Sequence, residues 1–255
     1  MIDFNRNKQY QQTIKEPITV SGIGLHSGKS TEIKLVPAQP DYGIKFIRTD
    51  IKNNNVIEAI WSNVSETVLS TTISNDKGTK ISTIEHLMSA LSGLHIDNLM
   101  VYINACEVPI MDGSSKPFVD LIENIGVEVQ NKKRKILNVK KTIEISNEKG
   151  SVRISPNKHF SIDFEIDFPS QLVSKQSCQL QLVNGNYKTD IASARTFGFE
   201  KDVEQLRSNG LALGGSLENA VVVGDNEILN KEGLRFNDEF VRHKILDSIG
   251  DLYLA

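Results

Sequence analysis

Hydrophobic residues follow two different periods along the chain, and together these periods predict a mixture of strands and helices. Segment 162–168 alternates apolar and polar residues without a slip, as a strand does when one face is in a core and the other in water. Segments 33–35 and 44–46 show the same alternation. At 82–91 and 241–252, apolar residues instead recur every three or four positions, which predicts amphipathic helices. Because strands precede a helix in each half of the chain, we expect an α+β fold.

A short charged stretch at 131–135 interrupts this pattern near the middle of the chain. It contains four consecutive basic residues and is followed by a strand pattern, which favours a solvated linker over a nucleic-acid-binding patch. We therefore expect an N-terminal domain over 1–131 and a C-terminal domain over 136–255.

The two predicted helices carry chemically active residues on the flank opposite their apolar stripes. His243 and Asp247 stand one helical turn apart, so their side chains point the same way. In the helix at 82–91, His86 lies among small residues and Glu85 lies beside it. Two histidines and one carboxylate with an open fourth position form a common catalytic zinc shell, and a neighbouring glutamate can act as general base. The pattern therefore predicts a zinc site that draws on both halves, a usual place for a substrate cleft.

Each helix also has a plainer interpretation. His243 and Asp247 alone are compatible with a solvated ion pair. Ser82 and Glu85 match a capping box, in which the glutamate reaches back to the serine backbone N–H and has no catalytic role.

Composition excludes several other classes of protein. The formal net charge is −3, from 29 basic and 32 acidic residues, and no nucleic-acid-binding signature is present. Cys106 and Cys178 are isolated, so neither a disulfide framework nor a thiolate zinc site is indicated. No run approaches the roughly 20 apolar residues of a membrane span. We expect a soluble, cytoplasmic protein without nucleic-acid partners and without stable membrane insertion.

Several segments together are very similar to the zinc-dependent UDP-3-O-acyl-N-acetylglucosamine deacetylases of lipid A synthesis. They span nearly the whole chain in the family's order: 22–29, 82–94 with 96–98, 109–118, 193–199, 210–216 and 233–251. The resemblance implies two similar α+β domains, each a sheet-and-helix sandwich with its own insert, and an active site at their interface. It also implies that His86, His243 and Asp247 bind Zn²⁺ and that Glu85 is the general base.

The resemblance implies further roles that the periodicity does not reveal. Thr196 matches a hydroxyl that helps to hold the developing oxyanion, Lys244 matches a substrate-binding lysine, and Asp251 matches a carboxylate that supports a catalytic histidine. Asp167 and Phe168 match a contact region for uridine. The remaining implied substrate contacts, most of them lining an acyl-chain passage in an insert near 196–223, are Phe197, Val203, Ala212, Gly215, Ser216, Ala220 and Val222.

One part of the family pattern is missing. The family carries a further histidine beyond the 241–252 helix, in a Gly-His pair that ends a strand, where it serves as general acid or electrostatic stabiliser. This chain stops at Ala255, and its last residues lack a glycine cap or a basic last turn. We interpret the chain as lacking its C-terminal portion, and we assign that role to none of His26, His95 and His159.

The expected function is zinc-dependent hydrolysis of the N-acetyl group of UDP-3-O-acyl-N-acetylglucosamine, with release of acetate. The sequence does not fix the oligomeric state, and we favour a monomer. Two alternatives remain open. One is a non-catalytic protein or fragment that binds zinc and the acylated UDP-sugar. The other is a zinc hydrolase that acts on a different N-acyl sugar.

Overall fold

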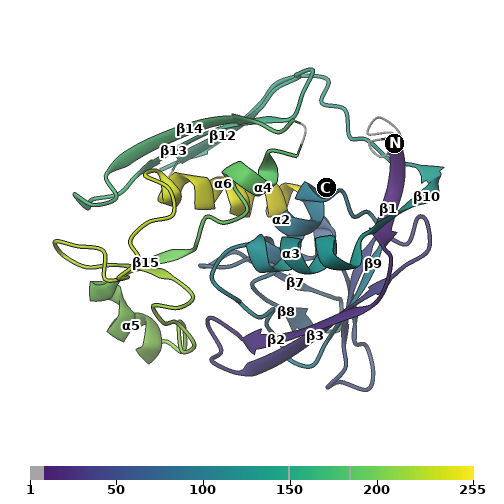
Figure 1. Cartoon of the computed structure of the whole chain (residues 1–255), viewed down its shortest axis with the longest axis horizontal. Helices are drawn as coiled ribbons and strands as arrows, with labels where there is room; N and C mark the ends of the chain where they lie inside the picture. The colour runs from purple at the N-terminus through teal and green to yellow at the C-terminus, as the bar shows by residue number, and fades with distance from the viewer. Residues whose placement is uncertain (1–8, 149, 184) are drawn as a thin grey trace.

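The first half of the chain is organised around a five-stranded sheet. The computed structural model describes residues 9–148, 150–183 and 185–255 (Figure 1). The strand order is β2 (Ile18–Ile23), β3 (Ser30–Pro37), β9 (Leu99–Ile103), β4 (Ile44–Arg48) and β5 (Val56–Glu58). Neighbouring strands are antiparallel except for β4 and β9, which are parallel. Alternate residues of β3 and β4 are buried, which confirms the alternation seen in the sequence.

Two smaller sheets complete this half. One contains β6 (Val64–Glu66), β7 (Thr72–Ser74) and β8 (Lys80–Ile81), and the other pairs β1 (Tyr10–Ile14) with β10 (Val127–Lys133). Residues 131–133 and 135 are exposed, as expected, but the pairing of β1 with β10 shows that most of the stretch 131–135 is a strand and not a linker. Residues 131–133 belong to β10, where Lys133 faces Tyr10, and Arg134 forms a 2.7 Å ion pair with Asp97. The connection without regular structure lies slightly later, at 134–142.

The second half contains two antiparallel hairpins, one small parallel sheet and one long helix. The hairpins are β11 (Ile143–Asn147) with β12 (Gly150–Ile154), and β13 (Ser161–Asp167) with β14 (Lys175–Gln181). The parallel pair is β15 (Phe197–Phe199) with β16 (Val221–Val223). The short segments are α4 (Tyr187–Asp190), the 3₁₀ turn Glu200–Asp202 and α5 (Val203–Ser208). The long helix α6 (Glu239–Leu252) runs beneath β13 and β14 towards α2 (Figure 1).

Helix α2 (Glu85–Gly93) lies between α6 and α3 (Lys116–Ile125). Its small residues are covered closely, as the sequence predicted. The ring of Tyr187 lies so near Gly93 that a β-carbon there would be 2.1 Å from a ring atom, and the Tyr187 hydroxyl donates a 2.9 Å hydrogen bond to Ser89. Close packing on this face brings the second half of the chain against α2.

Helix α6 is buried by two apolar clusters. Ile245 and Ile249 belong to a large core that extends into the first half, whereas Phe240 and Val241 pack in a smaller core with β13 and β16. The apolar stripe predicted for 241–252 is therefore buried except at its end, where Leu252 is 43% exposed. The chain is therefore a mixed α+β protein with several small sheets and few helices. Within the described residues, none of the helices has the length and apolar character needed to cross a membrane.

Candidate metal centre

Helix α2 begins at Glu85, two residues later than a capping box with Ser82 as its N-cap requires. Thr83 has a left-handed backbone conformation, with φ 56°, which separates Ser82 from the helix. The Ser82 hydroxyl donates to the carbonyl of Cys106 at 3.2 Å, and no side chain caps α2. The Glu85 carboxylate instead accepts the backbone N–H of Thr71 at 3.0 Å. The capping interpretation is therefore wrong, and Glu85 is available for another role.

The structure brings His86, His243 and Asp247 together in one cluster. Asp247 Oδ1 lies 3.5 Å from His86 Nε2 and 3.3 Å from His243 Nε2. The two imidazole rings are nearly perpendicular, with centroids 4.9 Å apart. One potential ligand atom from each residue lies within 4.8 Å of the others. His243 is only 1% exposed, so the interpretation of His243 and Asp247 as a solvated ion pair is also wrong.

The donor atoms of this cluster fit a metal ion. Within the described part of the chain, Asp247 Oδ1 and His86 Nδ1 are buried without a hydrogen-bond partner. A buried carboxylate oxygen without a donor is costly, and a divalent cation would satisfy it. Burial alone would raise the pKa of Asp247, but its interactions with His243 and Lys244 outweigh burial and hold that pKa well below the usual range. Asp247 is therefore ionised at neutral pH, as a metal ligand must be.

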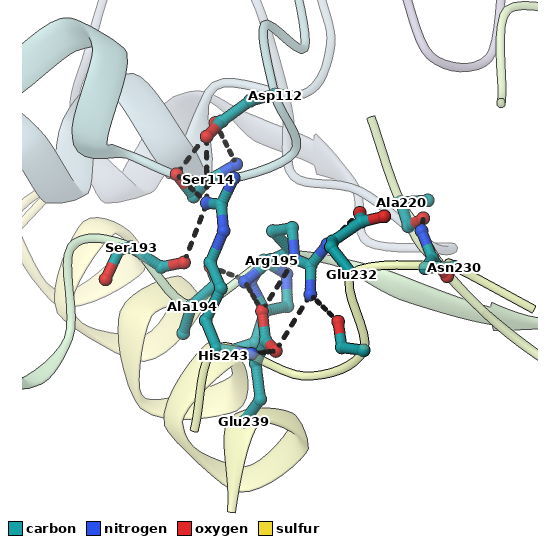
Figure 2. A network of polar contacts seen from close by, with 12 residues as sticks. Asp112, Ser114, Ser193, Ala194, Arg195, Ala220, Asn230, Glu232, Glu239 and His243 are labelled. Atoms are coloured by element: carbon teal, nitrogen blue, oxygen red, sulfur yellow. Dashed lines mark hydrogen bonds and ion pairs between the residues drawn. The ribbon is translucent and has the colours of Figure 1, made fainter. Parts of the chain in front are cut away.

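His243 is held in the form that a metal ligand needs. Its Nδ1 lies 3.0 Å from the carbonyl oxygen of Ala194, and because a carbonyl can only accept, Nδ1 must donate (Figure 2). Burial lowers the pKa of His243 to about 3, so the ring is neutral at pH 7. The Nε2 lone pair then faces Asp247 and is free to bind a cation.

Thr71, which the sequence pattern did not identify, connects the two other carboxylates of the site. Its backbone N–H donates to Glu85, and its hydroxyl donates to Asp251 Oδ1 at 2.7 Å. Burial raises the pKa of Glu85 to about 7, and loss of hydration raises the pKa of Asp251 to about 6. A carboxyl group with a pKa near 7 is suited to accept a proton at neutral pH.

Lys244 and Phe197 lie beside the cluster. Lys244 Nζ is 3.0 Å from Asp247 Oδ2 and 5.7 Å from the centre of the Phe197 ring. The Phe197 ring is in turn 6.5 Å from that of His243 and 5.6 Å from that of Phe168. The charge of Asp247, more than any other cause, raises the pKa of Lys244. The side chain of Lys244 therefore carries a positive charge next to the cluster.

The other predicted substrate contacts are not part of the cluster. Thr196 precedes β15, where its backbone N–H donates to Gly113 and its carbonyl accepts from Val221. Asp167 is exposed at the end of β13. The predicted acyl-chain positions surround α5 and β16, and all except the exposed Ser216 are half-buried: Val203, Ala212, Gly215, Ala220 and Val222. Half-buried apolar residues are compatible with a binding surface but do not by themselves define one.

Two histidines and one carboxylate, buried beside a glutamate with a raised pKa, form the kind of centre found in metal-dependent hydrolases. The comparison with known proteins narrows this class. Residues 11–255 match the family described as UDP-3-O-acyl N-acetylglycosamine deacetylase, and the chain belongs to this family. The resemblance seen in the sequence is thus confirmed.

Individual relatives agree with this assignment. The chain is 45% identical over 245 residues to the UDP-3-O-acyl-N-acetylglucosamine deacetylase of Syntrophus aciditrophicus (strain SB), covering 96% of this chain and 78% of the relative. It is 46% identical over 248 residues to the enzymes of the same name from Shewanella pealeana and Shewanella violacea, covering 96% of this chain and 81% of each relative.

Proposed function

We propose that this protein is a zinc-dependent amidohydrolase that removes the N-acetyl group of UDP-3-O-acyl-N-acetylglucosamine, with release of acetate, in lipid A biosynthesis. The observation that carries the proposal is the buried cluster of His86, His243 and Asp247 with Glu85 beside it. Family membership across residues 11–255 supports the choice of substrate.

In the proposed mechanism, His86, His243 and Asp247 would hold the zinc ion. When bound, zinc lowers the pKa of a coordinated water towards about 7 and polarises the amide carbonyl. Glu85 takes the proton from the attacking water, for which its raised pKa is suited. The amide C–N bond then breaks, and the sugar nitrogen takes up a proton as it leaves as the amine, while acetate is released. The Thr196 hydroxyl helps to hold the negative charge that develops on the amide oxygen.

The remaining residues position the substrate in this proposal. Lys244, which carries a positive charge beside the cluster, binds an anionic part of the UDP-sugar. Phe197 and Phe168 provide an aromatic surface next to His243. Asp167, at the end of β13, directly precedes Phe168 and contacts the uridine with it in this proposal. The acyl chain lies along Val203, Ala212, Gly215, Ser216, Ala220 and Val222. Asp251 takes the place of the carboxylate that supports a catalytic histidine in the family, and it is itself held by the Thr71 hydroxyl.

We also propose that 1–131 and 136–255 are two α+β domains, each a sheet-and-helix sandwich, with the site at their interface. The metal ligands support this arrangement, because they come from α2 in one half and α6 in the other. We propose a monomer that acts on a small molecule. We also propose that it has no nucleic-acid partner, and the net charge of −3 supports this point.

The test is acetate release by the purified chain after zinc has been restored. Three substrates or conditions distinguish the alternatives: the acylated UDP-sugar, UDP-N-acetylglucosamine without the acyl chain, and the acylated substrate with a chelator. The proposal expects release only from the acylated substrate with zinc present. Stoichiometric zinc without acetate release would favour a non-catalytic binding protein, whereas equal rates on both sugars would favour a hydrolase of another substrate.

A further inference from the structure

The peptide group that joins Ala194 to Arg195 is held at both ends by α6. Its carbonyl oxygen accepts the 3.0 Å hydrogen bond from His243 Nδ1. Its N–H donates to Glu239 Oε1, also at 3.0 Å. Glu239 and His243 stand one helical turn apart, and Figure 2 shows Ala194, Arg195 and Glu239 close to His243. Rotation of this peptide group would break both bonds.

Glu239 has little freedom to move. Its side chain is fully buried, and Arg195 is only 2% exposed. Besides the Arg195 N–H, its carboxylate accepts Arg195 Nε at 2.9 Å, Arg195 Nη2 at 3.2 Å and the backbone N–H of Arg235 at 2.6 Å. The Arg195 guanidinium is further fixed by Glu232 at 2.8 Å and by the carbonyl of Gly233 at 2.7 Å. The carboxylate that orients the 194–195 peptide is thus itself fixed by four donors.

Stability alone is a weak reason to bury such a pair. Removing two charges from water offsets most of their mutual attraction, so apolar residues of similar size serve a core equally well. The position of the pair gives a better reason. The pair of Glu239 and Arg195 adjoins the backbone carbonyl of Ala194, which accepts the hydrogen bond from the ring of the proposed metal ligand His243. Hydrogen-bond partners of a ligating histidine set the orientation of its ring and its basicity.

We infer that Glu239 and Arg195 are positioning residues of the metal site. They hold the 194–195 peptide so that its carbonyl keeps His243 Nδ1 protonated and aims Nε2 at Asp247. This inference rests on the proposed function, because it assumes that the cluster binds zinc. The carbonyl of Ala194 cannot be removed by substitution, so Glu239 is the residue through which the contact can be tested.

The experiment compares Glu239→Gln with Asp238→Asn. Both changes replace an acid by its amide at the start of α6 and remove one negative charge there. Asp238 differs in its partner, because it forms an i,i+4 ion pair with Arg242 at 2.6 Å and both side chains are partly exposed. Zinc dissociation constants of the full chain are measured at neutral pH by competition with a chelator. The absorption spectrum of the cobalt-substituted protein reports on ligand geometry.

We expect Glu239→Gln to weaken zinc binding by about tenfold or more and to change the cobalt spectrum, and Asp238→Asn to stay within about twofold of wild type. A folded Glu239→Gln protein with wild-type affinity would overturn the inference, and so would equal weakening by both variants. If circular dichroism shows that Glu239→Gln is unfolded, Glu239→Asp replaces it, because it keeps the charge but shortens the side chain. The expected weakening is then about threefold or more, and a smaller change overturns the inference. A wild-type chain without zinc affinity would overturn the proposed function together with this inference.

Discussion

Gly250 of α6 lies directly against the backbone of Glu85 in α2. A β-carbon on Gly250 would be 2.1 Å from the Glu85 carbonyl oxygen and 3.0 Å from the backbone nitrogen of Ser89. The two helices can approach this closely only because Gly250 has no side chain. Their approach also brings the rings of His86 and His243, one from each helix, to a centroid distance of 4.9 Å.

Gly250→Ala should therefore separate the two helices and disturb the metal site. Alanine is the better helix former by about 1 kcal/mol, so a substitution without a steric clash would stabilise the protein. The clash should instead lower the free energy of unfolding by about 1–3 kcal/mol and weaken zinc binding. Denaturant unfolding and zinc titration check both effects. Gly198→Ala is the control, because a β-carbon there would have no atom within 4 Å. Stabilisation by Gly250→Ala would show that the close contact is absent.

His86→Ala and His243→Ala should each abolish stoichiometric zinc binding at neutral pH. Each substitution removes one of the three proposed ligands whose potential ligand atoms lie within 4.8 Å of one another. Elemental analysis of the purified variants gives the zinc content. His159→Ala is the control, because His159 is exposed in the segment between β12 and β13. This variant should keep the zinc content of the wild type. Unchanged zinc in either cluster variant would show that the ligands are assigned wrongly.

Spacing within one element was the most reliable guide in the sequence. His243 and Asp247 share a flank because residues four apart always do so in a helix, whatever surrounds them. In a strand, successive side chains point to opposite faces, so the alternation at 162–168 likewise predicted which residues of β13 face the core. The exposure of that helix flank was not predictable in this way. An amphipathic pattern predicts that the polar flank of α6 faces solvent, yet α2 packs against this flank and buries His243.

Contacts between distant segments could not be read from local patterns. The capping box failed because Thr83 turns the chain away from the helix and Thr71 supplies the donor for Glu85. The charged run at 131–135 resembled a linker because its partner strand, β1, is more than 100 residues away at residues 10–14, and no local pattern reveals such a pairing. No sequence pattern identified Glu239, because its proposed role depends on its ion pair with Arg195, which forms only in the folded chain.

Glu85→Gln should lower turnover of the acylated UDP-sugar by roughly 10²–10⁴-fold, because an amide cannot accept the proton of the attacking water. The fold should change little, since the Gln amide oxygen can still accept the Thr71 N–H. Steady-state assays of the zinc-loaded protein, together with thermal melting, separate the two effects. Glu123→Gln, an exposed position in α3, is the control and should keep full turnover. A Glu85→Gln variant that melts lower but keeps its specific activity would assign Glu85 a purely structural role.

The stability of the zinc-free protein should also depend on the titration of Glu85. Burial raises the pKa of Glu85 from 4.5 to about 7 in the folded chain. Below pH 4.5 both the folded and the unfolded chain hold the proton, so Glu85 contributes no pH dependence. Between pH 4.5 and 7 the unfolded chain releases the proton while the folded chain keeps it. Folding stability must therefore fall as the pH rises through this window, by about 1.4 kcal/mol per pH unit and about 3 kcal/mol in total.

Comparison of wild type with Glu85→Gln reports this effect together with the change at His86, whose pKa Asp247 and Glu85 raise against the effect of burial. His243, whose pKa burial lowers to about 3, and Asp251 titrate in both proteins, so their contributions cancel in the difference. Unfolding free energies measured with a chelator at pH 4.5 and pH 7 should show the variant gaining about 3 kcal/mol relative to wild type. Added zinc should reduce this gain, because a nearby cation favours the ionised carboxylate. A difference that does not change with pH in the chelated proteins would mean that Glu85 is hydrated and ionised throughout, and it would remove the electrostatic reason for assigning Glu85 as the base.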